Sequence, residues 1–255
     1  MTPSTSADFD HVVDSWLAKH HASVFWGDRL LSLDKSTSFL TEPAFRDAFA
    51  SIFGNHQYDQ YKSPHTVAWR LHVLCWSAQQ SLSLNGDFVE CGTFKGDFAW
   101  VINRVVRPAS REKKFYLYDS FEGFAPTDQT VDSAYADFAN PIYREKGIFD
   151  SVQSRFAQDQ HVVITKGFLP EALQKAAPAV VSFLHMDLNS PGAELASLEF
   201  FWPRIVPGGV VVFDDYGWKV FAKQKELEDH FARERNHSIL ELPTGQGLLV
   251  KHPAG

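Results

Sequence analysis

Asp87-Phe-Val-Glu-Cys-Gly-Thr-Phe-Lys-Gly96 and Phe115-Tyr-Leu-Tyr-Asp-Ser-Phe-Glu-Gly123 are two stretches of similar design. Each is a short apolar run that ends in an acid, Glu90 or Asp119, with glycine close behind. Short apolar runs separated by helical patterns indicate strands of a buried parallel sheet. Such sheets bind ligands in the crevice outside the carboxyl ends of their strands. We therefore expect the two acids to lie side by side at a ligand-binding edge.

Candidate strands and helices alternate along the rest of the chain. The candidate strands are Phe88–Glu90, Phe115–Tyr118, His161–Thr165, Val180–Met186, Val210–Phe213, Ser238–Glu241 and Gly247–Lys251. Helical patterns lie between them, at Asp97–Val106, Pro170–Ala176, Ala193–Trp202 and Lys219–Arg233. This alternation predicts an α/β fold with a mostly parallel sheet and helices on both faces. Residues 122–160 are too long for a simple connection, so we expect a helix and a substrate-covering loop there.

The first third of the chain has helical patterns. Three helices are predicted, over Asp10–His20, from Thr41 with its first-turn proline, and from Ser63-Pro64. We therefore divide the chain into an N-terminal helical extension or cap, residues 1–84, and a sheet domain, residues 85–255. The extension is expected to pack on the sheet and to cover its site.

Composition excludes several classes of protein. The chain has 255 residues, of which 44% are hydrophobic, and a formal net charge of −7. Binding to a nucleic-acid backbone needs a basic surface, so no nucleic-acid partner is expected. Cys75 and Cys91 lie at apolar positions, which disfavours a disulfide framework or a zinc site. No apolar run can span a bilayer and the first residues do not resemble a signal peptide, so we expect a cytoplasmic protein without a membrane partner.

The turn formed by Glu90, Cys91, Gly92 and Gly96 differs from the dinucleotide fingerprint G-x-G-x-x-G because it carries an acid. A carboxylate repels a pyrophosphate but attracts an ammonium group, such as that of a methionine moiety. The turn therefore favours S-adenosylmethionine over NAD or ATP. The alternative is a tight strand–helix turn whose glycines serve packing only.

Asp119 lies 23 residues after Gly96, a spacing typical of an acid that binds ribose hydroxyls. The same spacing fits an NAD site, and an aspartate here could instead cap the next helix. Ser120 and Phe121 are candidates for the same pocket. Gly167 and Phe168 follow the third strand and are expected to approach the adenine.

A second group of candidate residues follows the fourth and fifth strands. Asp187, Asp214 and Asp215 converge if these strands are adjacent, and like charges so close require protonation or a cation. Oxygen ligands suit Mg²⁺. Asp187 is also expected to border the cofactor, and His185 is a candidate base, a partner that orients another group, or a structural histidine. Alternatively, the acids cap loops and tie down backbone.

Four segments of the chain together resemble the macrocin O-methyltransferase family. They are Val89-Glu-Cys-Gly-Thr-Phe-Lys-Gly96, Tyr118-Asp-Ser-Phe-Glu-Gly123, Pro207-Gly-Gly-Val-Val-Val-Phe-Asp-Asp-Tyr-Gly217 and Thr244-Gly-Gln-Gly-Leu-Leu-Val-Lys251. Ser38-Phe-Leu-Thr-Glu-Pro-Ala-Phe45 is similar to the N-terminal region of the family. Members are class I S-adenosylmethionine-dependent enzymes, many of which act on sugar hydroxyls of antibiotics and other glycosides.

The resemblance implies a Rossmann-like class I methyltransferase fold with a seven-stranded sheet, and a homodimer or higher homo-oligomer. It implies that Glu90, Gly92 and Asp119 hold the cofactor and that the acids after strands four and five hold a metal. The chain departs from the family at His185-Met-Asp-Leu-Asn189, where the family commonly has Asp-x-Asp-Leu-Tyr. This change bears on the acceptor and on metal dependence.

The expected reaction is displacement at the sulfonium methyl by an oxygen nucleophile, with Asp187 or His185 taking the proton and Mg²⁺ assisting. The expected acceptor is a hydroxylated small molecule, foremost a sugar of a glycoside, natural product or polysaccharide precursor. Two alternatives remain at this stage. One is a nucleoside-binding module of the same fold that has lost catalysis, and the other is an NAD-linked oxidoreductase, which Glu90 disfavours.

Overall fold

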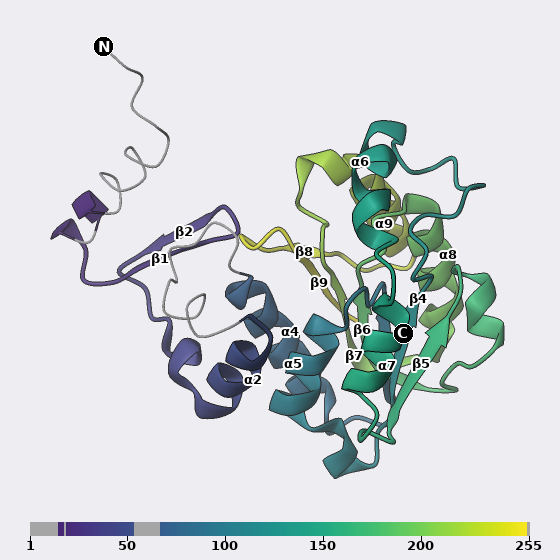
Figure 1. The fold of residues 1–255 in the computed structure, drawn as a ribbon, viewed down its shortest axis with the longest axis horizontal. Helices are drawn as coiled ribbons and strands as arrows, with labels where there is room; N and C mark the ends of the chain where they lie inside the picture. Colours follow the sequence, from purple (N-terminus) through teal and green to yellow (C-terminus); the bar gives the residue numbers. More distant parts are fainter. Residues whose placement is uncertain (1–14, 18, 54–66, 254–255) are drawn as a thin grey trace. The chain divides into compact units, whose positions relative to one another are not determined.

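The computed structural model describes residues 15–17, 19–53 and 67–253 (Figure 1). The chain divides into two compact units, Met1–His72 and Val73–Gly255. The division falls inside α4 (Ala68–Ser81), whereas the sequence predicts a boundary after residue 84. No helix among the described residues is both long and apolar enough to cross a membrane.

The first unit contains a β-hairpin that the sequence analysis does not predict. Strands β1 (Val24–Gly27) and β2 (Leu30–Leu33) pair antiparallel. They are joined by Asp28 and Arg29, which both have positive φ, as the two-residue hairpin turn requires. Helical pattern alone was therefore an incomplete description of this region.

The helix predicted from Thr41 is confirmed as α2 (Pro43–Phe53), which follows the short helix η1 (Ser38–Thr41). Of the helix predicted over residues 10–20, the described residues 15–17 and 19–20 are helical. The Ser63-Pro64 start lies outside the described residues.

The second unit is built on a seven-stranded sheet with the order β5-β4-β3-β6-β7-β9-β8. Its strands are β3 (Asp87–Cys91), β4 (Phe115–Asp119), β5 (Val162–Lys166), β6 (Val181–Met186), β7 (Ile205–Phe213), β8 (Leu240–Glu241) and β9 (Gly247–Val250). β9 pairs antiparallel with both β7 and β8, and the other pairings in this sheet are parallel, so the prediction of a mostly parallel sheet is confirmed. The strand order reverses at β3, between β4 and β6, which is where open α/β sheets bind ligands.

Helices connect the strands and cover the sheet on two sides, as Figure 1 shows for α5 and α8. The α-helices of this part are α5 (Asp97–Val106), α6 (Ser133–Tyr143), α7 (Ile148–Arg155), α8 (Pro191–Phe201) and α9 (Ala222–Glu234). The 3-10 helices are η2 (Pro108–Arg111), η3 (Glu171–Gln174), η4 (Trp202–Arg204) and η5 (Lys219–Phe221). Residues 122–160 therefore hold two helices, one more than the sequence predicts.

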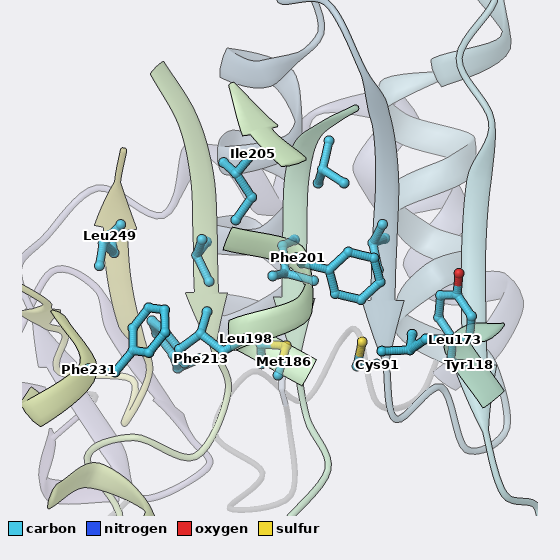
Figure 2. Packing of buried hydrophobic residues seen from close by; sticks show 14 of the residues in the cluster. Cys91, Tyr118, Leu173, Met186, Leu198, Phe201, Ile205, Phe213, Phe231 and Leu249 are labelled. Atoms are coloured by element: carbon cyan, nitrogen blue, oxygen red, sulfur yellow. The ribbon is translucent and has the colours of Figure 1, made fainter. Parts of the chain in front are cut away.

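The strands follow the predicted pattern because alternate side chains enter two different cores. Val89, Cys91, Leu184 and Met186 belong to a buried cluster with α8 and α9, whose helical residues appear over the strands in Figure 2. The labelled members from these helices are Leu198, Phe201 and Phe231. The intervening residues face α5, as the ring contact between Phe98 and His185 indicates. Glu90 and His185 therefore project to the same side of the sheet.

Candidate active site

A cavity of about 770 Å³ lies at the carboxyl ends of β3, β4, β5 and β6. Among its lining residues are Gly92 and Asp119, which follow β3 and end β4, and Asp187 and Asn189, which follow β6. Its volume lies within the range of sites that enclose a small-molecule ligand. The cavity therefore contains the two groups of residues that the sequence analysis treats separately.

Backbone hydrogen bonds beyond the ends of the strands hold these segments side by side. The N–H of Gly92 donates to the carbonyl of Tyr118 at 2.8 Å, and that of Asp187 donates to Cys91 at 2.8 Å. Gly92 has φ +90°, and a Cβ at this position would lie 1.8 Å from the Asp187 carbonyl oxygen. Glycine is required here because the backbones after β3 and β6 approach so closely.

The carboxylate of Asp119 organises the cavity wall at the end of β4. Its oxygens accept hydrogen bonds from the backbone N–H groups of Phe94, at 2.8 Å, and Phe121, at 2.6 Å. Burial raises the pKa of Asp119, while these two donors act in the opposite direction. Each oxygen retains a further lone pair, so the carboxylate can also accept from ribose hydroxyls.

The structure separates the predicted cofactor residues into two sets. Those that line the cavity are Gly92, Asp119, Ser120, Gly167, Phe168 and Asp187. Four others, Glu90, Cys91, Gly96 and Phe121, are not among its lining residues. Glu90 is 1% exposed and accepts hydrogen bonds from the Thr93 hydroxyl and from His185. Its charge lies next to the Gly92 turn rather than on the cavity wall.

The predicted metal residues come together in part. One potential ligand atom from each of His185, Asp187 and Asp214 lies within 4.8 Å of the other two. Asp215 is outside this three-residue group, and its role as a ligand stays a prediction. Asp214 is held by Gln246, whose side-chain amide donates to Oδ1 at 2.9 Å. A nitrogen and two carboxylates at this spacing fit a divalent cation.

His185 is fully buried between two acids. Nδ1 is 3.0 Å from Oε1 of Glu90, and Nε2 is 3.6 Å from Oδ1 of Asp214. Burial opposes the charged imidazolium, but the contacts with Asp214 and Glu90 outweigh it and raise the pKa of His185 to about 10. Because the ring is buried and does not line the cavity, Asp187 is the better candidate for the catalytic base.

Two tyrosines of α6 form a polar chain to Asp187 that the sequence analysis does not assign. The hydroxyls of Tyr135 and Tyr143 are 3.1 Å apart, and Tyr143 is 3.4 Å from Nδ2 of Asn189. Nδ2 of Asn189 lies 3.5 Å from Oδ1 of Asp187. Burial raises the pKa of both tyrosines, so both keep their protons at neutral pH. The two tyrosines are about two helical turns apart in the sequence, and this spacing could have indicated that they lie on the same face of a helix.

A buried pair of carboxyl groups supports the loop after β6. Oε1 of Glu194 on α8 accepts from the backbone N–H groups of Leu188, at 2.9 Å, and Asn189, at 3.2 Å. Burial and then the charge of Glu194 raise the pKa of Glu228 on α9 well above its ordinary value. Burial also raises the pKa of Glu194, although its neighbour Glu228 and the two N–H groups oppose this. Glu228 is therefore the member of the pair that stays protonated.

Glu228→Gln is expected to stabilise the protein at pH 8 by about 1 kcal/mol or more. A carboxyl whose pKa is raised by folding destabilises the fold as pH rises above its unfolded pKa, and glutamine removes that penalty. The gain should therefore disappear near pH 4.5. Chemical unfolding at both pH values measures it, with the exposed Glu226→Gln as the control. A gain of equal size at both pH values would contradict a protonated Glu228.

The sheet order and the strand-end cavity are those of the class I methyltransferase fold. The structure of the O-methyltransferase NovP matches with a TM-score of 0.66 at 16% identity, over 82% of this chain and 98% of NovP. Residues 70–239 match the family model described as Macrocin-O-methyltransferase (TylF). The chain belongs to this family, which confirms the predicted resemblance, fold and class of enzyme.

Two curated relatives have printed activities. The 8-demethyl-8-(2,3-dimethoxy-alpha-L-rhamnosyl)-tetracenomycin-C 4'-O-methyltransferase of Streptomyces olivaceus is 24% identical over 178 residues, which are 66% of this chain and 67% of that protein. The Mycinamicin III 3''-O-methyltransferase of Micromonospora griseorubida is 26% identical over 142 residues, or 51% of this chain. The match spans 55% of that second relative, about half its length.

Proposed function

We propose that this enzyme transfers a methyl group from S-adenosylmethionine to a hydroxyl of a small molecule, foremost a sugar of a glycoside or other natural product. The observation that carries the proposal is the single cavity that joins Asp119 to Asp187. The rhamnosyl compound in the name of the Streptomyces relative supports a sugar acceptor.

The cofactor is assigned to the β3–β4–β5 side of the cavity. Asp119 accepts from the ribose hydroxyls, and Gly167 and Phe168 border the adenine. The methionine end lies over the Gly92 turn, which borders the cavity. The buried charge of Glu90 attracts the ammonium group from beneath this turn.

The acceptor is assigned to the β6 side, against aromatic residues from the segments after β3 and β4. The ring of Tyr143 packs edge-on against Phe94, with centroids 5.4 Å apart, and against Phe124 at 5.6 Å. All three residues line the cavity. A wall of this kind offers apolar surface to a sugar ring, while Asn189 and the tyrosine hydroxyl offer hydrogen bonds to its substituents.

The chemistry follows from this arrangement. A lone pair of the acceptor oxygen forms a bond to the methyl carbon as the carbon–sulfur bond breaks, and that bonding pair remains on sulfur to give S-adenosylhomocysteine. Asp187 takes the proton of the hydroxyl. The cavity walls hold the oxygen in line with the departing sulfur, which supplies a large part of the acceleration.

A divalent cation is proposed to assist at the same edge, held by Asp187, Asp214 and His185. When bound, such an ion supplies Lewis-acid stabilisation of the developing alkoxide. This donor set differs from the three acids predicted from the sequence because a ring nitrogen of His185 lies in the group and Asp215 does not.

Asp119→Ala is expected to weaken binding of S-adenosylhomocysteine about 100-fold, since two hydrogen bonds to a charged acceptor contribute about 1.5 kcal/mol each. Calorimetric titration of the purified chain measures this. Glu122→Ala is the matched control, because Glu122 lies in the same motif but its carboxylate forms an exposed pair with Lys166. Failure of the parent protein to bind S-adenosylhomocysteine would overturn the proposal. Binding without turnover of any hydroxyl acceptor would favour the non-catalytic binding module.

A further inference from the structure

The two ring nitrogens of His185 have different surroundings. Nδ1 is 3.0 Å from the Glu90 carboxylate, whose other oxygen accepts from the Thr93 hydroxyl. Because an ionised carboxylate only accepts hydrogen bonds, Nδ1 carries a proton in this contact. In the neutral imidazole, Nε2 then presents a lone pair on the opposite side of the ring.

Nε2 is buried and has no hydrogen-bond partner among the described residues. It is aimed at the carboxylate edge, where Asp214 is 3.6 Å away, which is longer than a hydrogen bond. Asp187 completes the group of three ligand atoms within 4.8 Å of one another. A buried nitrogen lone pair facing two carboxylates requires either another proton or a cation.

We propose that His185, Asp187 and Asp214 bind a first-row transition-metal ion, with Nε2 of His185 as a direct ligand, in place of the Mg²⁺ expected from the acids alone. Imidazole suits transition metals, whereas Mg²⁺ prefers oxygen ligands. Metal-binding histidines commonly donate their other ring N–H to a carboxylate, as His185 does to Glu90. The inference rests on the proposed function, because it names the ion of the same site.

The competing arrangement contains no metal–nitrogen bond. A second proton on Nε2, the state that a pKa of about 10 favours while no ion is bound, would turn His185 into an imidazolium that pairs directly with Asp214. Any metal at this edge would then be bound by carboxylate oxygens only. The two arrangements differ in whether a nitrogen is bonded to the ion.

Pulsed EPR of the full chain loaded with Mn²⁺ distinguishes them. We expect the ¹⁴N coupling of a directly bound imidazole in the parent protein, lost in His185→Asn and kept in His161→Asn. His161 is a matched control because it contacts Asn103 just before β5 begins, at the opposite edge of the sheet. Mn²⁺ bound without nitrogen coupling, or no Mn²⁺ binding, would overturn the inference. The parent spectrum decides the question even if His185→Asn fails to fold.

Calorimetry with Zn²⁺ and Mg²⁺ gives a second readout. His185→Asn should weaken Zn²⁺ binding about 100-fold. Loss of a residue that only hydrogen-bonds to a metal ligand already weakens binding by up to about 100-fold, and loss of a direct ligand should have at least that effect. Mg²⁺ binding should change far less, and equal changes for both ions would overturn the assignment of Nε2. Titration with S-adenosylhomocysteine tests the proposed function separately. Nitrogen coupling without cofactor binding removes the methyltransferase proposal alone, and cofactor binding without nitrogen coupling removes the metal assignment alone.

Discussion

Asp187→Asn is expected to lower the rate of methyl transfer about 1000-fold, within the range attributed to general bases. Its affinity for S-adenosylhomocysteine should remain nearly unchanged. Asparagine keeps the shape of the side chain and the backbone hydrogen bond to Cys91, but its amide cannot take the proton of the acceptor. Single-turnover assays with a sugar acceptor, together with cofactor titration, measure the two quantities.

The control for this prediction is Asp150→Asn, which makes the same chemical change at an exposed position of α7. It should leave both rate and affinity unaltered. If Asp187→Asn turned over as fast as the parent enzyme, Asp187 would have no part in the mechanism. If it lost cofactor affinity to the same degree as turnover, its role would be cofactor binding.

Gly92→Ala is expected to cost about 3 kcal/mol of unfolding free energy, the combined cost of a left-handed backbone and of overpacking. The added methyl would lie 1.8 Å from the carbonyl oxygen of Asp187, and φ at this position is +90°. The backbone must move to relieve this contact, which separates the proposed cofactor half of the cavity from the proposed acceptor half. Binding of S-adenosylhomocysteine should therefore weaken together with stability.

Gly147→Ala separates backbone strain from the steric clash. Gly147 has φ +82°, but a Cβ there would meet nothing within 4 Å. This variant should lose only the strain, roughly 1–2 kcal/mol. Chemical denaturation of both variants provides the comparison. Equal losses would show that the close approach of Gly92 to Asp187 contributes nothing.

The strands of the sheet were predictable because each is a short, local, apolar segment. The segments at Asp87–Cys91 and Phe115–Asp119 end in acids that register places beside one another, with Cys91 paired to Tyr118. β7 was the least accurate of these predictions. It begins at Ile205 and includes Pro207-Gly-Gly209, because Gly208 and Gly209 exchange hydrogen bonds with Lys251. That partner lies far away in sequence and cannot be inferred from a local turn signal.

Other features depended on residues without a local signature. Asp28 and Arg29 both have positive φ, but neither is the glycine or asparagine that usually marks such a turn. The hairpin could therefore not be predicted from its turn residues. Glu194 and Glu228 each read as ordinary helical acids. They become a buried pair of carboxyl groups with raised pKa values only because α8 and α9 pack against each other and exclude water from both.

His185 shows which features could be predicted from the sequence and which depend on the tertiary structure. The parallel sheet, the acids at its strand ends and the family could be predicted from local sequence. Each of these predictions uses short apolar runs and the residues directly after them, which are neighbours in the chain. The surroundings of His185 depend on strand order, which places Glu90 of β3 on one side of its ring and Asp214 after β7 on the other. Burial in that position leaves Nε2 without a hydrogen-bond partner among the described residues. Tertiary structure alone decided this, because desolvation and interatomic distance arise only when distant segments pack together.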